Sequence, residues 1–151
     1  MRIKTKRKLP KTKVVFKPRE NRAYLKGRIY KDYLDYMAIH KSASVVEMDT
    51  VYNDVSNGPF IQTFQIVDLN LMIGLYYERR TTECIMNGVA GIKKLLQKDF
   101  SRLFQVLLTD RGSEFFATEE FEELGCKKFY CDAMQSCQKP HVENNQIYFY
   151  I

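Results

Sequence analysis

The feature that most limits the possible folds of this chain is a run of bulky residues that ends on an acid and a glycine. It lies within Leu103–Phe116 and reaches Asp110, with Gly112 two positions later. A run of this length, closed in this way, predicts a buried strand that delivers Asp110 to its carboxyl end. In an open α/β sheet, ligands and metals gather at that edge. A carboxylate there is costly unless a cation meets it, so the sequence predicts a cationic partner for Asp110.

Charge is distributed unevenly along the 151 residues. Residues 1–31 hold 13 Lys and Arg against one acid, a net of +12, whereas the remainder holds 11 against 17, a net of −6. A basic arm on an acidic globule favours a polyanion as the partner of the arm and cations as partners of the acidic part. The alternative for the arm is a solvated, disordered tail. The length predicts one domain with a real core.

The four cysteines occur in a chain whose start, Met1–Lys8, lacks the apolar segment of a signal peptide. No run is long enough to span a membrane. We therefore expect free thiols in the cytoplasm and no membrane partner. Cys126, Cys131, Cys137 and His141 lie close enough along the chain to suggest zinc, but their spacing matches no C-x₂-C pattern.

The segment Val45–Tyr52 is β-branched and predicts a strand. Alternation places Glu47 and Asp49 on one face of this strand and Met48 on the other. An aspartate in mid-strand is unusual because strands disfavour it. Two interpretations stay open, an edge strand with a solvated face or a strand that brings Asp49 to a site.

Hydrophobic periodicity and turn residues predict the other elements. Four apolar residues spaced along 85–96 form one buried stripe of a helix. Pro140 suits the first position of a helix and places Glu143 in its first turn. The aromatic segment 27–37 has an imperfect helical period and is interpreted as the cover of a sheet edge. The remaining expected elements are the strands Phe60–Val67, Leu71–Tyr77 and Lys127–Cys131 and the helices Glu83–Gln97 and Glu119–Leu124.

The predicted order is three strands, a helix, a strand, a short helix, a strand and a helix. The first three strands predict an antiparallel meander, and right-handed crossovers make the later strands parallel. This order predicts an α/β fold, a ribonuclease-H-like mixed five-stranded sheet with flanking helices. That arrangement, rather than periodicity, implies that the first and fourth strands are neighbours. Asp49 and Asp110 would then meet, and the last helix would bring Glu143 over the same edge.

Three islands of sequence resemble one known family. They are Val46–Val51, Leu108–Phe115 and Gln138–Asn145. Together they are similar to the catalytic core of bacterial insertion-sequence DDE transposases of the insertion-sequence-thirty type, within the retroviral-integrase superfamily. The 33 positions from Asp110 to Glu143 are typical of that family. Three islands in order at this spacing are far more specific than one Asp-x-Gly.

The resemblance covers roughly residues 24–146 and implies a catalytic, metal-binding triad of Asp49, Asp110 and Glu143. Hard oxygen ligands suit Mg²⁺ or Mn²⁺, and two ions are expected. Such a site would catalyse strand cleavage and strand transfer in DNA, the chemistry of transposition, integration and recombination. The alternative for each acid taken alone is a solvated surface carboxylate.

The resemblance also implies partners. These are DNA, as transposon ends and target, and self-association or pairing with intact transposase at the nucleoid of a bacterial cytoplasm. Basic side chains would neutralise backbone phosphates without reading sequence. Glu47 and Glu114 are interpreted as surface or supporting residues rather than ligands. The residues expected to contact DNA are Lys6, Arg7, Lys8, Lys11, Lys13, Lys139 and His141, the last of which could equally be a solvated residue at a helix start.

The chain is expected to depart from that family at both ends. We divide it into a basic arm at 1–43, a catalytic core at 44–146 and an apolar tail at 147–151. The family places a helix-turn-helix region before the core and a basic continuation after the last helix, and the tail is typical of a frameshift or premature stop. We expect a truncated last helix, and a misplacement of about 1 Å can cost ~100-fold in rate. Three interpretations follow: an active core, a non-catalytic fragment that binds DNA or inhibits transposase, and an inert remnant of a mobile element.

Overall fold

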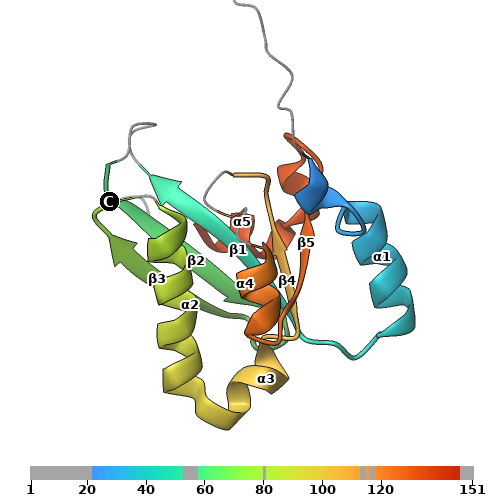
Figure 1. Cartoon of the computed structure of the whole chain (residues 1–151), viewed down its shortest axis with the longest axis horizontal. Coiled ribbons are helices and arrows are strands. Elements are labelled where there is room, and N and C mark those ends of the chain that lie inside the picture. Colours follow the sequence, from blue (N-terminus) through green and yellow to red (C-terminus); the bar gives the residue numbers. More distant parts are fainter. Residues whose placement is uncertain (1–21, 53–57, 80, 113–114, 116–117, 147–151) are drawn as a thin grey trace, which may run out of the picture.

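Five strands form one mixed sheet in the order β3-β2-β1-β4-β5. A computed structural model of the chain describes residues 22–52, 58–79, 81–112, 115 and 118–146. β2 pairs antiparallel with both β1 and β3, whereas β4 pairs parallel with both β1 and β5. The predicted ribonuclease-H-like sheet, a meander followed by parallel strands, is confirmed (Figure 1). The strands are β1 (Val45–Tyr52), β2 (Phe60–Ile66), β3 (Leu71–Tyr77), β4 (Val106–Thr109) and β5 (Lys127–Tyr130).

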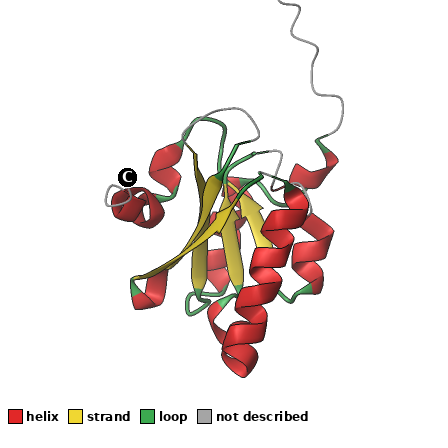
Figure 2. Ribbon diagram, turned by 90° about the vertical axis from the view of Figure 1, so that its left-hand side faces the viewer, coloured by secondary structure: helices red, strands yellow, loops and turns green. Residues whose placement is uncertain are grey.

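Helices cover both faces of the sheet (Figure 2). On one face, α2 and α3 pack over the larger apolar cluster, together with Phe121 of α4. On the other face, α1 packs over β5 and α5 contacts β1 and β2. The α-helices are α1 (Tyr30–Ile39), α2 (Thr82–Leu96), α3 (Phe100–Leu103), α4 (Thr118–Glu123) and α5 (Pro140–Gln146). Short 3-10 turns are η1 (Ala23–Leu25), η2 (Val67–Leu69), η3 (Gln97–Asp99) and η5 (Ser136–Gln138).

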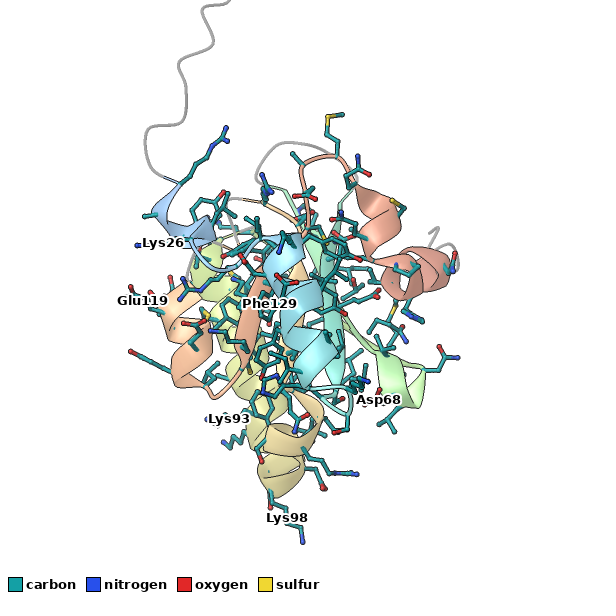
Figure 3. All side chains as sticks on the ribbon, turned by 90° about the vertical axis from the view of Figure 1, so that its right-hand side faces the viewer. Lys26, Asp68, Lys93, Lys98, Glu119 and Phe129 are labelled. Carbon is teal, nitrogen blue, oxygen red and sulfur yellow. The ribbon has the colours of Figure 1, made fainter. Side chains whose placement is uncertain are left out.

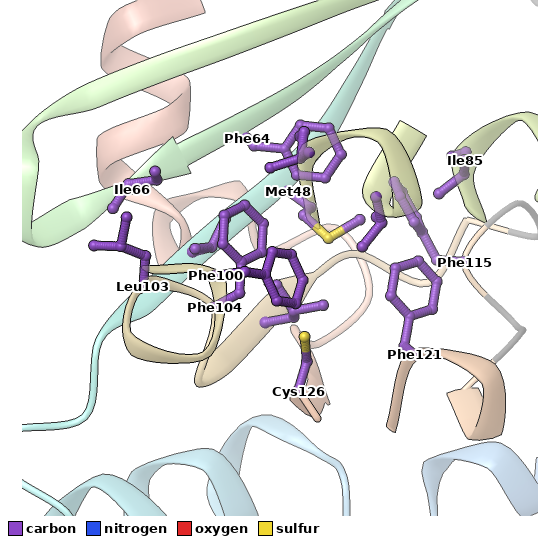
Figure 4. Close-up of a cluster of buried hydrophobic side chains, with 14 of the residues drawn as sticks. Met48, Phe64, Ile66, Ile85, Phe100, Leu103, Phe104, Phe115, Phe121 and Cys126 are labelled. Atoms are coloured by element: carbon purple, nitrogen blue, oxygen red, sulfur yellow. The ribbon is translucent and has the colours of Figure 1, made fainter. Parts of the chain in front are cut away.

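The sequence prediction placed the start of the central strand too early. Leu103 ends the short helix α3 instead, and β4 begins only at Val106. Phe100 and Phe104 stack with ring centroids 4.6 Å apart and are buried against the sheet (Figure 4). A helical turn brings residues four positions apart within stacking distance, whereas a strand, which rises about 3.3 Å per residue, would hold them about 13 Å apart. Burial of the two rings therefore overrides the strand-like run.

The helix predicted at 83–97 is confirmed as α2. Thr81 precedes it, and the Thr81 hydroxyl oxygen accepts a hydrogen bond from the Cys84 N–H at 3.2 Å, as an N-cap residue does. Three members of the predicted stripe, Ile85, Val89 and Ile92, are buried against the sheet. α2 has 15 residues. Neither it nor any other helix in the described part of the chain is both long and apolar enough to cross a membrane.

The aromatic segment before β1 forms η1 and α1. Tyr33 and Tyr36 of α1 contact the ring of Phe129 in β5, at centroid distances of 5.8 and 5.5 Å. Figure 3 shows the labelled Phe129 beside α1. Ile29 makes an isolated parallel bridge with Tyr130 at the outer edge of β5. The segment therefore covers that edge of the sheet. The division of the chain at residue 43 stays a prediction, and the part of the arm at 1–21 lies outside the described residues.

A lysine is buried among aromatic rings on β5. Lys128 is 0% exposed, and its ammonium lies 4.0 Å from the ring centroid of Phe121. The Lys128 Nζ and the Tyr130 hydroxyl both donate a hydrogen bond to the carbonyl oxygen of Phe115, the hydroxyl at 2.7 Å. Phe115 follows the segment that begins at Asp110, so these two donors anchor that segment to β5. Burial lowers the pKa of Lys128 to about 7.

This buried lysine predicts that the protein becomes more stable above neutral pH. An unfolded lysine has a pKa of about 10.4. Between about pH 7 and that value the unfolded chain binds one more proton than the folded chain. From about pH 7 to about pH 8.5 the free energy of unfolding therefore rises with pH, by about 1.4 kcal/mol per pH unit at most. Above this range the thiols of Cys126 and Cys131, whose pKa values burial raises, oppose the rise. Urea denaturation at several pH values measures this slope.

The matched comparison uses Lys128→Met and Lys127→Met. Lys127 is the exposed neighbour on the same strand. We expect Lys128→Met to flatten the rise of stability with pH and Lys127→Met to leave it unchanged. Equal slopes in the parent and Lys128→Met would contradict the prediction.

Candidate functional site

Two aspartates meet at the carboxyl end of the parallel strands. Asp49 lies within β1, and Asp110 directly follows β4. Glu47 of β1 pairs in register with Leu108 of β4, so the two aspartates stand two residues further along neighbouring strands. The adjacency that the predicted fold implied for Asp49 and Asp110 is therefore present in the structure.

A buried ammonium lies between the two carboxylates. Lys139 precedes α5 and is 2% exposed. Its Nζ lies 3.2 Å from Asp49 Oδ2 and 4.0 Å from Asp110 Oδ2. The same Nζ donates a hydrogen bond to the carbonyl oxygen of Met48 at 3.1 Å. Lys139, expected to contact DNA phosphate, instead supplies the cationic partner that the sequence predicted for Asp110.

Local backbone groups orient both carboxylates. The Thr50 N–H donates to Asp49 Oδ1 at 2.8 Å, and the Gly112 N–H donates to Asp110 Oδ1 at 2.9 Å. In both cases the other oxygen, Oδ2, faces the Lys139 ammonium. The two acids therefore present one oxygen each to a common point.

The two aspartates differ in exposure. The side chain of Asp49 is 14% exposed and that of Asp110 is 47% exposed. Burial raises the pKa of the Asp49 carboxyl, the Lys139 ammonium opposes this, and the Asp110 carboxylate adds to it. Burial disfavours the ionised form of the Asp49 carboxyl, and a cation at this point stabilises that form.

The segment after Asp110 is tied to the end of β5. The Arg111 Nε donates to the carbonyl oxygen of Cys131 at 2.9 Å, and its Nη2 lies 3.0 Å from Asp132 Oδ1. Arg111, next to Asp110, is thus bonded to the two residues that directly follow β5.

The third predicted acid lies on α5. The backbone of Glu143 is in the helix, one residue after Val142, which is 0% exposed. The side chain of Glu143 lies outside the described residues. Among the side chains that the structure does describe, no group of three His, Cys, Asp or Glu residues is arranged to hold a metal ion. The complete triad therefore stays a prediction.

Glu47 has a larger role in the fold than the sequence indicates. It is 3% exposed, and its Oε2 accepts a hydrogen bond from the Val142 N–H at 2.7 Å. The signal available in the sequence was an acid in mid-strand, two residues before Asp49. That signal cannot identify a partner that is 95 residues away.

The other predicted site residues are placed as follows. His141 is exposed on α5. Cys126 and Cys131 are buried in the two separate apolar clusters, and Cys137 is exposed, so these cysteines do not share one environment. Glu114 and the predicted DNA contacts of the arm lie outside the described residues, the latter being Lys6, Arg7, Lys8, Lys11 and Lys13.

A hollow of about 720 Å³ lies at the opposite end of the sheet. Ala43, Gln105 and Lys127 line it at the starts of β1, β4 and β5. Asp49 lies in the second half of β1 and Asp110 follows the other end of β4, so this hollow is separate from the acidic site.

The donor set fits a hard divalent cation. Two carboxylate oxygens converge on one positive charge, and oxygen ligands are what Mg²⁺ and Mn²⁺ prefer. Asp110, nearly half exposed, leaves the site open to solvent on one side. In this structure the Lys139 ammonium lies at the point that the two carboxylate oxygens share.

No family model and no curated protein matches this sequence. Among solved structures, the catalytic core domain of BIV integrase matches at a TM-score of 0.52 with 17% identity, over 70% of this chain and 65% of that chain. A simian T-cell lymphotropic virus intasome in complex with PP2A regulatory subunit B56 gamma matches at a TM-score of 0.54 with 14% identity, over 69% of this chain and 37% of that chain. This chain thus spans about two thirds of the first and little over one third of the second. It has the ribonuclease-H-like fold of the BIV integrase catalytic core.

Proposed function

We propose that this chain is a transposase core of the insertion-sequence-thirty type that cleaves and joins DNA strands with divalent metal ions. The observation that carries the proposal is the convergence of Asp49 and Asp110 on one ammonium, at 3.2 and 4.0 Å. These acids come from neighbouring parallel strands of a fold shared with the BIV integrase catalytic core. Two carboxylates that already share one positive charge are suited to share a metal ion.

All three acids are metal ligands in this proposal. Asp49 and Asp110 would hold Mg²⁺ or Mn²⁺, and Glu143 would complete the site from α5. When bound, two such ions activate a water or a 3′-hydroxyl and stabilise the leaving oxygen of an in-line displacement at phosphorus. The protein contributes orientation, through the Thr50 and Gly112 N–H groups that fix one oxygen of each aspartate.

DNA is the proposed partner, as transposon ends and target at the nucleoid. The net charge of +12 over residues 1–31 supports contact with a polyanion. Lys6, Arg7, Lys8, Lys11 and Lys13 would neutralise backbone phosphates, and exposed His141 could reach a phosphate beside the site. Self-association, or pairing with an intact transposase, would bring two DNA ends together.

Removal of metal tests the proposal directly. The full chain is incubated with labelled duplexes that carry the terminal repeats flanking its coding sequence, with Mn²⁺ or with excess EDTA. We expect cleaved strands with Mn²⁺ and only the background of a protein-free sample with EDTA, because the acids cannot activate a nucleophile without a cation. Cleavage that persists in EDTA would contradict a metal-dependent site.

A second function is favoured by Lys139. Its buried ammonium already offsets one of the two negative charges of the aspartates, as expected of a chain that binds DNA without cutting it or that inhibits an intact transposase. In the same assay, retarded but uncut DNA in a complex that weakens steeply with salt would support this function. Free, uncut DNA at low salt would contradict both functions.

A further inference from the structure

Three consecutive residues of β1 hold the start of α5. Glu47 Oε2 accepts a hydrogen bond from the Val142 N–H, and the Met48 carbonyl oxygen accepts one from Lys139 Nζ. Asp49 Oδ2 lies 3.2 Å from the same Nζ. The chain segment that begins α5 is therefore attached to the strand that carries one of the proposed ligands.

Of these contacts, the Glu47 contact supplies an acceptor to the first turn of α5 from β1. An apolar side chain at this buried position would pack without the cost of removing a carboxylate from water. Burial raises the pKa of the Glu47 carboxyl, and the Val142 N–H opposes that rise. The N–H groups in the first turn of a helix have no partner within the helix, so Val142 needs an acceptor. Glu47 supplies it from the strand.

The hydrogen bond between Glu47 and Val142 also affects how closely the proposed metal ligands can approach one another. Val142 is 0% exposed and immediately precedes Glu143, whereas Glu47 is two residues before Asp49. A contact at 2.7 Å therefore joins the two chain segments that must approach for Glu143 to reach the aspartates. α5 has seven residues, and besides β1 it contacts β2.

We propose that Glu47 is a positioning residue that fixes α5 on β1 and so sets the distance of Glu143 from Asp49 and Asp110. This inference rests on the proposed function. Glu47 is not assigned as a ligand, because one of its oxygens is occupied by the Val142 N–H and the side chain is 3% exposed.

A matched pair of variants tests the contact. Glu47→Gln keeps an oxygen acceptor, whereas Glu47→Met has nearly the same size and no acceptor for an N–H. Hydrogen exchange is followed by mass spectrometry on the full chain in EDTA. We expect exchange in α5 to be about 10- to 100-fold faster in Glu47→Met, the range for loss of a hydrogen bond to a charged group. Glu47→Gln should remain within about threefold of the parent, since it retains the acceptor.

A change in exchange that is confined to α5 would distinguish a positioning role of Glu47 from a general loss of stability. The β2 and β4 peptides should exchange as in the parent, and Glu119→Met, at an exposed acid of α4, should change neither region. Unchanged α5 exchange in Glu47→Met, or an equal increase across the whole sheet, would overturn the proposal. If Glu47→Met does not fold, Glu47→Ala replaces it, with the same expectations.

Calorimetric titration with Mn²⁺ tests whether the contact between Glu47 and Val142 affects metal binding at the proposed site. We expect binding to weaken by about 10-fold in Glu47→Met and to stay near the parent in Glu47→Gln. Equal weakening in both variants would make Glu47 a ligand and overturn the positioning role. A parent that binds no Mn²⁺ would refute the proposed function, while the exchange result would still decide whether Glu47 holds α5.

Discussion

Asp110→Asn should lower Mn²⁺-dependent DNA cleavage by about 1000-fold or more and leave the fold intact. The substitution removes a carboxylate charge that would hold the metal ion. A 1000-fold lower rate corresponds to the loss of about 4 kcal/mol of transition-state stabilisation. The amide oxygen of asparagine can still accept the Gly112 N–H that now bonds to Asp110 Oδ1. The side chain is 47% exposed, so its ion pair with Lys139 contributes at most about 1 kcal/mol to stability.

The measurement is the initial rate of strand cleavage in Mn²⁺, with thermal unfolding recorded on the same samples. Asp68→Asn is the matched control, because Asp68 is an exposed aspartate of η2, in the connection between β2 and β3. It should retain the parent rate. If Asp110→Asn cleaves DNA as fast as Asp68→Asn, the acidic site is not the origin of the activity.

The order of elements was the part of the fold most open to prediction. Buried stripes and turn residues are local, and they correctly located α2 and all five strands to within a few residues. The exception was the approach to β4, where Phe100 and Phe104 needed a helical turn to stack in the core. Nothing in a run of bulky residues distinguishes a strand from a short buried helix.

The sequence was sufficient to predict that Asp49 and Asp110 lie together, but not which side chains contact them. Asp49 is visible as an unusual carboxylate in mid-strand and Asp110 as one at a strand end, and the predicted topology implies that they meet. Lys139 and Glu47 find their partners across more than 90 residues, and no local pattern encodes such a pair. Lysine and glutamate are usually exposed, so the sequence predicted a contact with DNA for Lys139 and a surface or supporting role for Glu47.

The imperfect period of α1 also has a physical cause. None of its residues is fully buried. Its contact with the sheet is made by half-buried tyrosines, among them Tyr33 and Tyr36 against Phe129. A helix that lies on a sheet through half-buried tyrosines leaves no clean apolar stripe in the sequence.

Lys139→Met should destabilise the protein in EDTA and strengthen its affinity for Mn²⁺. In the variant, the Asp49 carboxylate stays 14% exposed beside Asp110 with no cation, and removal of one partner of a buried ion pair typically costs about 3–5 kcal/mol. The lost ammonium also repels any metal ion at the same point, so its removal favours binding. Urea denaturation in EDTA and in Mn²⁺ measures both effects.

The two expected effects are linked, because a ligand that binds only the folded state stabilises it in proportion to the logarithm of its concentration over Kd. Mn²⁺ should therefore raise the free energy of unfolding more in Lys139→Met than in the parent, while Lys98→Met, at an exposed lysine, should behave as the parent. Equal stabilisation of all three proteins would mean that the ammonium and the metal do not compete. Stabilisation of Lys139→Met alone would instead identify Lys139 as a permanent counter-ion and favour the non-catalytic function. The same titration thus separates a catalytic core from a DNA-binding relative of it.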